Sequence, residues 1–436
     1  MNLTTLDISI NSFNGQIPIE VGVYLPRLAS LNISKNSLNG SIPSSFGDMS
    51  SLQILDLSNN QLSGEIPEYL VVGCVSLKLL VLSNKVWKGG LYLSNNHLNG
   101  RIRRWLGNLS ALQDIIMLNN HLEGPIPNEI CQIRYLEILD LSNNSISGSI
   151  PSCSSFISIK EVHLSRNMLQ GPHLGFNHLY GNIPHWINTL SSLNCLILKN
   201  NSFEGEVPTQ LCELNQLRLI DLSNNHFIGQ IPFCFKSTAF DGEDGDHAIT
   251  DSSIITPKVG PPNSQRKNIS YFYQGRILTS MSGIDLSCNK LTGEIPYQIG
   301  NLTRIHALYS SHNNLTVSIP VTFSHLQNIE SLDLSYNNLN GKIPPQLVGM
   351  YTLSFFSVAH NELSGKTLEM INQFETFGES SYEGNPHLCG PPLPKCDANG
   401  SSPPMPTPST ENNEDNNSID MEIFYISFTV SYIIVL

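Results

Sequence analysis

The chain has 436 residues, a formal net charge of −13 at pH 7 and only 14% charged residues. A net negative charge argues against general nucleic-acid binding, because that function needs a basic surface. Few charges together with many asparagine and serine residues are instead typical of a secreted protein.

An asparagine recurs every 24 residues along most of the chain, within the template L-x-x-L-x-L-S-x-N-x-L-x-G-x-I-P, which residues 52–67 (LQILDLSNNQLSGEIP) contain in full. The step joins Asn36 to Asn60; Asn96 to Asn120 and Asn144; Asn177 to Asn201 and Asn225; and Asn289 to Asn313, Asn337 and Asn361. A fixed period of 20–29 residues with this leucine spacing is the signature of a leucine-rich-repeat solenoid.

Within one turn, Leu55 and Leu57 alternate with Asp56 and Ser58, which is the period-2 pattern of a strand. One such strand cannot bury its apolar face alone, but strands stacked about 4.8 Å apart form a parallel sheet over a continuous core. Asn60 follows where the chain turns inward, and its amide is suited to satisfy backbone groups there. The sequence therefore predicts an α/β-type repeat solenoid: a curved horseshoe, mostly strand and loop, with a parallel sheet on its concave face.

Residues 1–232 form the first block of repeats. Half-turn gaps are expected near residues 86–90 and 171–174, because the repeat asparagines on either side are too close together for a full turn. Arg103 also stands where the template has proline. Such conflicts between local sequence and overall pattern predict strain or disorder at these places.

Residues 233–280 lack the repeat pattern and form an insertion, which we call the island. Insertions of this length in a solenoid are usually functional or disordered. Aromatic and arginine side chains are enriched at interface cores, so we predict that Tyr271, Phe272, Tyr273 and Arg276 contact a ligand or a partner. The alternative is that the island is only a disordered spacer.

Four further repeats occupy residues 281–368, and residues 369–396 have the cysteines and prolines of a C-terminal cap. Residues 397–422 are rich in proline, serine and asparagine, and they contain six acidic residues but no lysine or arginine. This composition predicts a solvated, disordered linker.

Residues 423–436 (IFYISFTVSYIIVL) are uncharged and mostly apolar. As a helix they would span about 21 Å of the roughly 30 Å of hydrocarbon in a bilayer, so we expect a truncated transmembrane helix. A buried terminal strand is the alternative. Ser427 and Ser431 form a small-x-x-x-small step, which predicts a helix–helix contact within the membrane.

The cysteine spacing predicts disulfides. Cysteines 22 residues apart fall side by side on adjacent turns, and two pairs share this spacing and the same phase within the repeat. The expected bonds join Cys131 to Cys153, Cys212 to Cys234 and, in the tail, Cys389 to Cys396. Small apolar filling is the alternative. Cys74, Cys195 and Cys288 are left over, and their pairing stays open.

Eleven Asn-x-Ser/Thr sequons support passage through the secretory pathway, although a repeat rich in asparagine and serine also produces sequons by chance. The candidate glycosylation sites are Asn2, Asn32, Asn39, Asn108, Asn143, Asn200, Asn268, Asn301, Asn314, Asn399 and Asn416.

The binding surface is expected on the concave face, at outward positions that carry aromatic or basic side chains. These candidates are Tyr92, His163, Arg166, Lys199, Tyr309, His312, Tyr336 and His360. Aspartates that recur at one strand position are interpreted mainly as part of the template.

Four stretches resemble the plant receptor-like proteins, the kinase-less relatives of leucine-rich-repeat receptor kinases: residues 182–187 (NIPHWI), 282–296 (SGIDLSCNKLTGEIP), 356–366 (FSVAHNELSGK) and 381–396 (SYEGNPHLCGPPLPKC). The resemblance implies a single-pass plasma-membrane receptor with extracellular repeats. Such a receptor senses a peptide or protein ligand and signals in defence or development through a partner leucine-rich-repeat receptor kinase. Family members use the island and the four following turns for co-receptor contact.

Two other functions remain open, namely a secreted inhibitor of cell-wall-degrading enzymes and a non-functional truncated product. Met1 opens directly into a repeat without a signal peptide, so we expect a piece of a longer precursor. No H-E-x-x-H, C-x-x-C or G-x-S-x-G motif occurs, and we expect no enzymatic activity, cofactor or metal.

Overall fold

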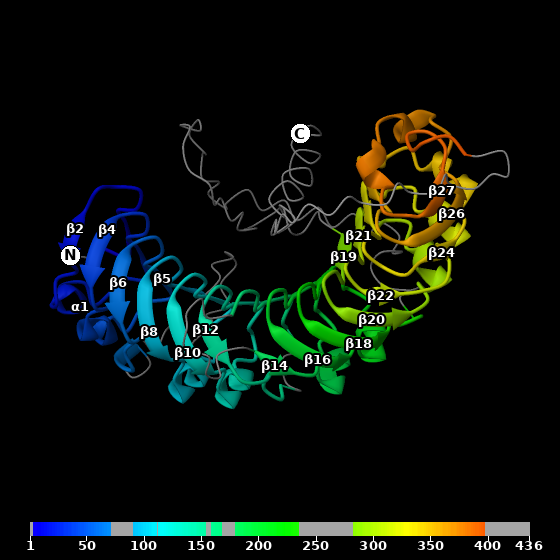
Figure 1. The fold of residues 1–436 in the computed structure, drawn as a ribbon. Coiled ribbons are helices and arrows are strands. Elements are labelled where there is room, and N and C mark those ends of the chain that lie inside the picture. Colours follow the sequence, from blue (N-terminus) through cyan, green and yellow to red (C-terminus); the bar gives the residue numbers. More distant parts are fainter. Residues whose placement is uncertain are drawn as a thin grey trace, which may run out of the picture.

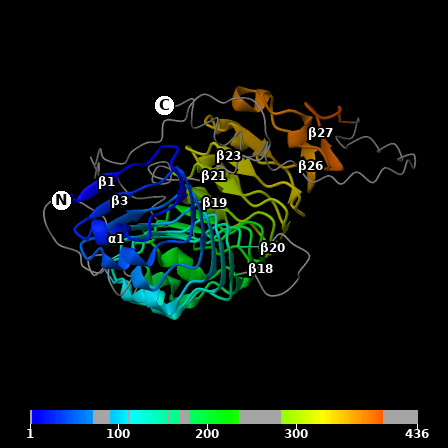
Figure 2. The ribbon, with the colours of Figure 1, turned by 90° about the vertical axis from the view of Figure 1, so that its left-hand side faces the viewer.

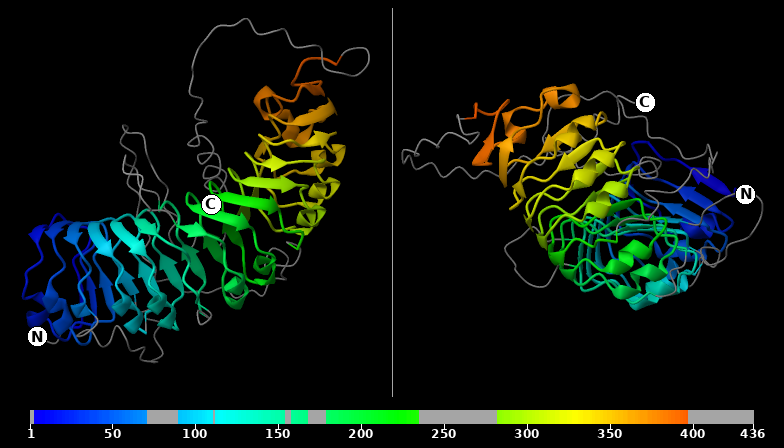
Figure 3. Two further views of the ribbon diagram at one scale, coloured as in Figure 1. Left: turned by 60° about the horizontal axis from the view of Figure 1, so that its bottom comes forward. Right: turned by 90° about the vertical axis from the view of Figure 1, so that its right-hand side faces the viewer.

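A computed structural model describes residues 3–70, 90–110, 112–153, 158–167, 179–234 and 282–396. These residues form a stack of turns that follow one another in sequence order along a curved arc (Figures 1 and 3). The fold is a leucine-rich-repeat solenoid, as the sequence predicts.

Thirteen short parallel strands form the main sheet, on the inner side of the arc (Figures 1 and 2). In order they are β1 (Thr5–Asp7), β3 (Ser30–Asn32), β5 (Ile54–Asp56), β7 (Gly90–Tyr92), β9 (Asp114–Ile116), β11 (Ile138–Asp140), β13 (Glu161–His163), β15 (Cys195–Ile197), β17 (Leu219–Asp221), β19 (Gly283–Asp285), β21 (Ala307–Tyr309), β23 (Ser331–Asp333) and β25 (Phe355–Ser357). Each turn contributes one strand, whose central residue points into the core. Leu55 and Leu57 are fully buried, whereas Asp56 between them faces outward.

The repeat asparagine holds each turn to the one before it. The Nδ2 group of Asn60 donates to the carbonyl oxygens of Leu57 and Ser58 in its own turn, at 3.1 and 3.3 Å, and to Ile33 O of the preceding turn at 3.1 Å. Its Oδ1 accepts from Leu38 N at 3.0 Å. The amide thus satisfies buried backbone groups that would otherwise have no partner.

This asparagine ladder runs the whole length of the described solenoid. Its members are Asn36, Asn60, Asn96, Asn120, Asn144, Asn167, Asn201, Asn225, Asn289, Asn313, Asn337, Asn361 and Asn385. Asn385 extends the ladder beyond the last predicted repeat, into the C-terminal cap. Asn177, which shares the 24-residue phase, lies outside the described ranges.

The main sheet continues across every interruption of the sequence pattern. β5 pairs directly with β7, β13 with β15 and, on either side of the island, β17 with β19. The predicted half-turn gaps fall almost entirely outside the described ranges, as does the island after residue 234. The core therefore keeps one strand per turn wherever strands are described.

A second set of strands follows the ladder asparagines on the flank of the arc, in sheets of six, five and three strands. The first comprises β2 (Asn14–Gln16), β4 (Ser37–Gly40), β6 (Gln61–Gly64), β8 (His97–Arg101), β10 (His121–Pro125) and β12 (Ser145–Ser147). The second comprises β14 (Tyr180–Gly181), β16 (Ser202–Glu206), β18 (His226–Gln230), β20 (Lys290–Gly293) and β22 (Asn314–Leu315), and the third β24 (Asn340–Gly341), β26 (Glu362–Lys366) and β27 (His387–Cys389). The template glycine lies at or next to the end of most of these strands and has positive φ, 82° at Gly64, which a side chain would strain.

Short helices cover the outer side of the arc (Figure 1). They are α1 (Val21–Tyr24) and the 3-10 helices η1 (Ser44–Asp48), η3 (Arg104–Asn108), η4 (Asn128–Gln132), η5 (His185–Thr189), η6 (Thr209–Glu213), η7 (Tyr297–Asn301), η8 (Val321–His325), η9 (Pro345–Gly349), η10 (Asn372–Glu375) and η11 (Glu379–Ser381). Extended prolines such as Pro127 (φ −70°, ψ 141°) precede most of them. The prediction of strain at Arg103 was wrong, because Arg103 adopts the same extended conformation, with φ −83° and ψ 149°.

Three disulfides are present: Cys131–Cys153, Cys212–Cys234 and Cys389–Cys396, with Cα atoms 5.0, 5.7 and 5.0 Å apart. The first two connect neighbouring turns on the outer side, as their 22-residue spacing predicts. Cys195 and Cys288 are free thiols, and Cys74 lies outside the described ranges.

Aromatic rings close the C-terminal end of the core. The ring of Phe356 in β25 packs against Phe374, Phe377 and Tyr382, with centroids 5.2 to 5.7 Å apart. These three residues belong to the segment that the sequence assigns to the cap. They cover the last strand, which would otherwise leave its apolar side open to solvent.

In the described part of the chain, no helix has the length and apolar character needed to cross a bilayer. Residues 423–436, with Ser427 and Ser431, lie beyond it. The predicted membrane helix and its contact therefore stay predictions.

The ladder gives a direct stability prediction. Asn337 is buried and makes four side-chain hydrogen bonds, to Ser310 O, Leu334 O, Ser335 O and Leu315 N. We expect Asn337→Ala to lower the free energy of unfolding by at least about 2 kcal/mol, since several buried backbone groups lose their partner. Urea unfolding followed by circular dichroism measures this.

The adjacent Asn338 provides a matched control, because it is exposed in the same turn. Asn338→Ala should change the unfolding free energy by less than about 0.5 kcal/mol. Equal losses in the two variants would contradict the assigned role of the ladder.

Candidate functional site

Each strand of the main sheet presents outward side chains to the concave face. In many turns the last strand residue is an aspartate whose Oδ1 accepts from the backbone N–H and hydroxyl of the serine two residues later. In the turn of Asp56 and Ser58 these distances are 3.0 and 2.6 Å. The same bonds recur at Asp221 and Asp333. The recurrent aspartates thus stabilise the end of the strand, which agrees with their interpretation as template residues.

Tyr92 lies flat along the sheet. Its hydroxyl donates to Asp114 Oδ2 on the neighbouring strand at 2.6 Å, and its ring covers Gly90, where a Cβ atom would clash with the ring. Burial, together with the negative charge of Asp114, raises the pKa of Tyr92 above its usual range. The phenol is therefore engaged within the protein, although part of it faces the concave side.

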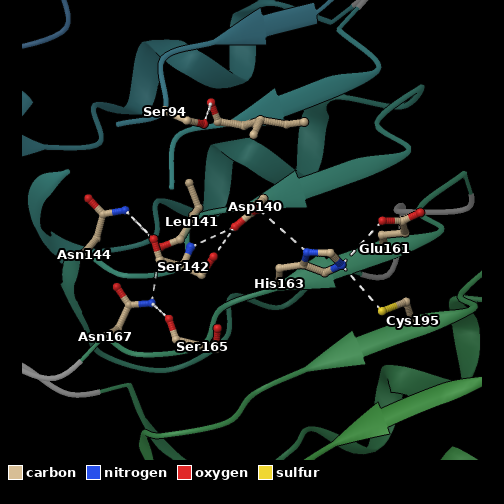
Figure 4. Close-up of polar contacts among 11 residues, drawn as sticks. Ser94, Asp140, Leu141, Ser142, Asn144, Glu161, His163, Ser165, Asn167 and Cys195 are labelled. Carbon is tan, nitrogen blue, oxygen red and sulfur yellow. Dashed lines mark hydrogen bonds and ion pairs between the residues drawn. The ribbon is translucent and has the colours of Figure 1, made fainter. Parts of the chain in front are cut away.

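His163 is the centre of a buried polar cluster that spans three strands (Figure 4). Its Nδ1 lies 3.7 Å from Asp140 Oδ2, and its Nε2 lies 3.4 Å from Glu161 Oε2 and 3.5 Å from Cys195 Sγ. Burial lowers the pKa of His163, but the Cys195 sulfur and the Asp140 carboxylate outweigh it, so the net pKa is raised. Burial raises the pKa of the Cys195 thiol. The imidazole of His163, between Asp140, Glu161 and Cys195, thus connects β11, β13 and β15 through side chains.

A second charged cluster comprises Asp221 on β17, Asp285 on β19 and Lys199, two residues after the end of β15. Burial, and next the repulsion from Asp221, raise the pKa of Asp285 to about 6, whereas the attraction of Lys199 opposes the change. Burial also raises the pKa of Asp333 on β23. The concave face next to the island therefore carries carboxyl groups that titrate above their ordinary range.

The residue three positions after each main-sheet strand has positive φ; we call these residues the turn column. Its members are Ile10, Lys35, Asn59, Asn95, Asn119, Asn143, Arg166, Asn200, Asn224, Cys288, His312, Tyr336 and His360. Asparagine tolerates this conformation better than other residues with a side chain. In the first block the amides bond to one another, from Asn95 to Asn59 at 3.0 Å and from Asn119 to Asn95 at 2.7 Å.

In the last turns, aromatic rings replace the amides of the turn column. The ring centroid of Tyr336 lies 4.2 Å from that of His312 and 4.2 Å from that of His360, with interplanar angles of 11° and 20°. We call these three residues the ring stack. His360 Nε2 also lies 3.8 Å from Glu383 Oε1 of the cap segment. The ring stack is thus one continuous unit across three turns.

The ring stack combines strain with accessibility. Tyr336 has φ 52° and is 37% exposed, although bulky side chains seldom adopt positive φ. Strained residues of this kind concentrate at functional sites. Burial lowers the pKa of His312. The charge of Asp333 opposes this decrease and that of His360 adds to it, so the net pKa is lowered and the neutral imidazole is favoured. The ring edges can therefore donate and accept hydrogen bonds beside apolar ring surface.

The structure divides the predicted concave residues into two groups. Arg166 is exposed, and the ring stack is accessible through Tyr336, His312 and His360. His163, Lys199 and Tyr309 are buried, Tyr309 being only 6% exposed, and Tyr92 is bonded to Asp114. The buried residues suit structural roles better than direct contact. The island residues Tyr271, Phe272, Tyr273 and Arg276 lie outside the described ranges.

Sequence reasoning selected the three rings one by one and missed that they form a stack. Their common spacing of 24 residues was the available signal, because residues one period apart lie on adjacent turns. Glu383 was also missed. It belongs to the cap segment, where no repeat phase points toward His360.

The comparisons with known proteins agree with this geometry. The family model described as "Leucine rich repeat" matches residues 1–62, 26–85 and 303–363, and a second leucine-rich-repeat model matches residues 135–156, 216–238 and 280–302.

Two curated relatives come from Solanum lycopersicum. Receptor-like protein EIX2 is 46% identical over 427 residues, an alignment that covers 88% of this chain and 41% of the relative. Cuscuta receptor 1 is 63% identical over 187 residues, which cover 42% of this chain and 16% of the relative. The chain thus spans less than half the length of these relatives. Among solved structures, the plant peptide hormone receptor RGFR1 in complex with RGF2 has a TM-score of 0.69 and 28% identity, with 89% of this chain and 52% of that one covered.

The fold and the repeat pattern define a leucine-rich-repeat protein. Within that class, the chain belongs to the plant receptor-like proteins.

The raised pKa of Asp285 predicts a pH-dependent stability. An aspartate has a pKa near 3.9 in the unfolded chain, so the folded state binds more protons between about pH 4 and 6, and stability falls as pH rises through this window. We expect Asp285→Asn to raise the unfolding free energy by about 1–3 kcal/mol at pH 8 and to change it little at pH 4.

Asn32 shows that an amide can make the same bonds, because its Oδ1 accepts from Ser34 N and Oγ at 3.1 and 2.7 Å. Asp56→Asn is the control. Asp56 occupies the same position in its turn, but its neighbours on the adjacent strands are Asn32 and Tyr92, whereas Asp285 has the carboxylate of Asp221 on one side. A gain for Asp285→Asn that is equal at pH 4 and pH 8 would contradict the titration.

The structure also divides the sequons. Asn39, Asn108, Asn301 and Asn314 are exposed, whereas Asn143 is partly buried and donates to Asn119 Oδ1 at 2.6 Å. Asn32 donates to Asp7 Oδ2, and Asn200 accepts from Asn224. Asn2, Asn268, Asn399 and Asn416 lie outside the described ranges.

We predict that secreted, folded protein carries glycans at the four exposed sites and leaves Asn143 unmodified. A glycan on Asn143 would break its hydrogen bond to Asn119 within the turn column. Glycosidase treatment in ¹⁸O water followed by peptide mass spectrometry measures each site. Full occupancy of Asn143 in monomeric, folded protein would refute the prediction.

Proposed function

We propose that this chain is the ligand-sensing part of a plasma-membrane receptor whose concave face, near the ring stack, contacts a peptide or protein. The observation that carries the proposal is the ring stack itself, an accessible and strained set of His312, Tyr336 and His360 in the turns after the island. Aromatic side chains with polar edges are frequent anchors of protein interfaces.

The chemistry of the neighbouring face restricts the ligand. Asp221, Asp285 and Asp333 lie on strands close to the stack, and the net charge of the chain is −13. A ligand with a basic group beside an apolar or aromatic one would match both the carboxyl groups and the rings. The solved plant receptor with 28% identity is in complex with a peptide hormone, which supports the same ligand class.

The chain is proposed to signal through a partner leucine-rich-repeat receptor kinase, in defence or development, without a catalytic activity of its own. Both relatives are named as receptors or receptor-like proteins, which supports the signalling role. The island, the glycans and the membrane segment with Ser427 and Ser431 belong to this proposal. So does the contact of Tyr271, Phe272, Tyr273 and Arg276 with a ligand or partner kinase.

The experiment compares two double variants in the full chain, expressed as a secreted, tagged protein. Tyr336→Ala with His360→Ala removes most of the ring stack. His97→Ala with His121→Ala removes another stacked pair, with centroids 5.8 Å apart, from β8 and β10 of the flank sheet. Binding is measured by co-immunoprecipitation with a panel of co-expressed receptor-kinase ectodomains, with and without leaf extracellular fluid.

We expect the Tyr336→Ala/His360→Ala variant to recover at least tenfold less kinase ectodomain, or to show an at least tenfold smaller increase in recovery when the leaf fluid is added. The His97→Ala/His121→Ala variant should retain the wild-type level. Circular dichroism melts confirm that both variants fold. Wild-type recovery by the Tyr336→Ala/His360→Ala variant would overturn the proposed role of the ring stack.

A further inference from the structure

A groove with a volume of 920 Å³ lies where the flank strands β8 and β10 lead into the short helices η3 and η4 of the outer side. Its walls come from Glu68 and from the four following turns of the solenoid: residues 101–105, residues 125–129, then Gly148, Ser149 and Pro151, and finally Tyr180. A neighbouring hollow of 440 Å³ shares Glu68, Arg103 and Trp105 with it and extends to Ser41. The groove lies beside the place where the six-stranded flank sheet ends at β12 and the five-stranded one begins at β14.

Arg103 is the unusual residue of this groove, because the template has proline at its position. One nitrogen of its guanidinium group, Nη2, donates to both carboxylate oxygens of Glu65 in the preceding turn, Oε1 at 2.9 Å and Oε2 at 2.8 Å. Both side chains are about half exposed, and exposed pairs add little stability. Since the backbone there is already in the conformation that proline prefers, the fold itself does not require the arginine.

Two further arginines of the same turn stand beside this pair. Arg104 is 86% exposed and only loosely paired, with its Nε 3.7 Å from Glu129 Oε1. Arg101 is exposed and forms no ion pair with any residue in the described ranges. A protein with a net charge of −13 thus places three of its 23 lysines and arginines within four residues. The planar guanidinium group of arginine can form bidentate hydrogen bonds with a carboxylate.

Aromatic surface completes the groove. Trp105 is partly buried against the core beside the arginines, and Tyr180, at the far end, is 53% exposed. Adjacent turns are about 4.8 Å apart, so four turns cover about 14 Å, which matches four to five residues of an extended chain. The shape suits a short linear segment that crosses the turns.

The glutamates of the groove favour an acidic polypeptide over an acidic polysaccharide as its ligand. Glu68 and Glu129 line the same walls as the arginines. A polyuronate, with a carboxylate on every sugar, would bring some of its charges next to these glutamates. A polypeptide can place one or two acidic side chains at the arginines and neutral or aromatic ones elsewhere.

We propose that this outer groove is a second binding site, which takes an extended polypeptide segment carrying an acidic side chain next to an aromatic or apolar one. Arg101 and Arg104 bind the carboxylate, Arg103 fixed by Glu65 forms the wall between them, and Trp105 and Tyr180 pack against the apolar side chain. The site is independent of the concave ligand site.

The test uses a displayed library of random octapeptides, selected in parallel against the secreted full chain and its Arg101→Gln/Arg104→Gln variant. We expect peptides with an Asp or Glu adjacent to an aromatic residue to be enriched on the wild type only. Fluorescence anisotropy with the enriched peptides should show at least tenfold weaker binding to the double variant. Replacing their acidic residue by its amide should have the same effect.

Three controls accompany this test: the Arg103→Pro variant, the Tyr336→Ala variant and competition with a galacturonate oligomer. Arg103→Pro restores the repeat template and should keep the melting temperature while it weakens peptide binding. Tyr336→Ala, on the concave face, should leave peptide binding unchanged. Equal enrichment on wild type and double variant, or enriched peptides without acidic residues, would overturn the proposal. Displacement of the peptides by a galacturonate oligomer at lower concentration than by unlabelled peptide would also overturn it, in favour of an acidic glycan.

Discussion

The structure depends on the hydrogen bonds of one buried amide in each turn. A ladder asparagine such as Asn337 ties its own strand end to the previous turn and satisfies the backbone where the chain turns inward. This bonding fixes the position of each turn relative to the previous one. Strands therefore pair in register even where the intervening sequence is irregular, as between β5 and β7. The described part of the concave face thus stays regular.

The same constraint creates the candidate binding site. The chain reaches each ladder asparagine through a residue with positive φ, so every turn exposes one side chain at a strained position beside the concave face. Asparagine tolerates this backbone and is the usual choice in the first block. Histidine and tyrosine fill the position at His312, Tyr336 and His360, where stacking at 4.2 Å offsets part of the strain. The scaffold therefore dictates where the rings lie, and the local sequence dictates what they can recognise.

The period of 24 residues and its leucines were enough to predict the solenoid and the concave sheet, and the 22-residue cysteine spacing predicted two of the three disulfides, because these features follow from geometry that successive turns repeat. Accessibility could not be predicted in the same way. Tyr309 and Tyr336 are both outward-facing tyrosines of neighbouring turns, yet one is 6% and the other 37% exposed. The difference depends on the position within the turn and on side chains from other turns, which sequence phase alone does not describe. Arg103 was misjudged for a different reason, since an arginine can adopt the extended backbone that the template proline has at this position.

The disulfide between Cys212 and Cys234 has a mechanical consequence. Cys234 is the second residue of the island and the last one described before Ser282, and its sulfur is bonded to Cys212 in η6 of the preceding turn. On the other side the chain re-enters the solenoid at Ser282 and passes directly into β19, and the only free thiols described are Cys195 and Cys288. A pulling force on the island would therefore be borne by a disulfide bond at one end and by non-covalent strand pairing and core packing at the other. Traction from a bound partner would be transmitted asymmetrically, toward the turns that carry the ring stack.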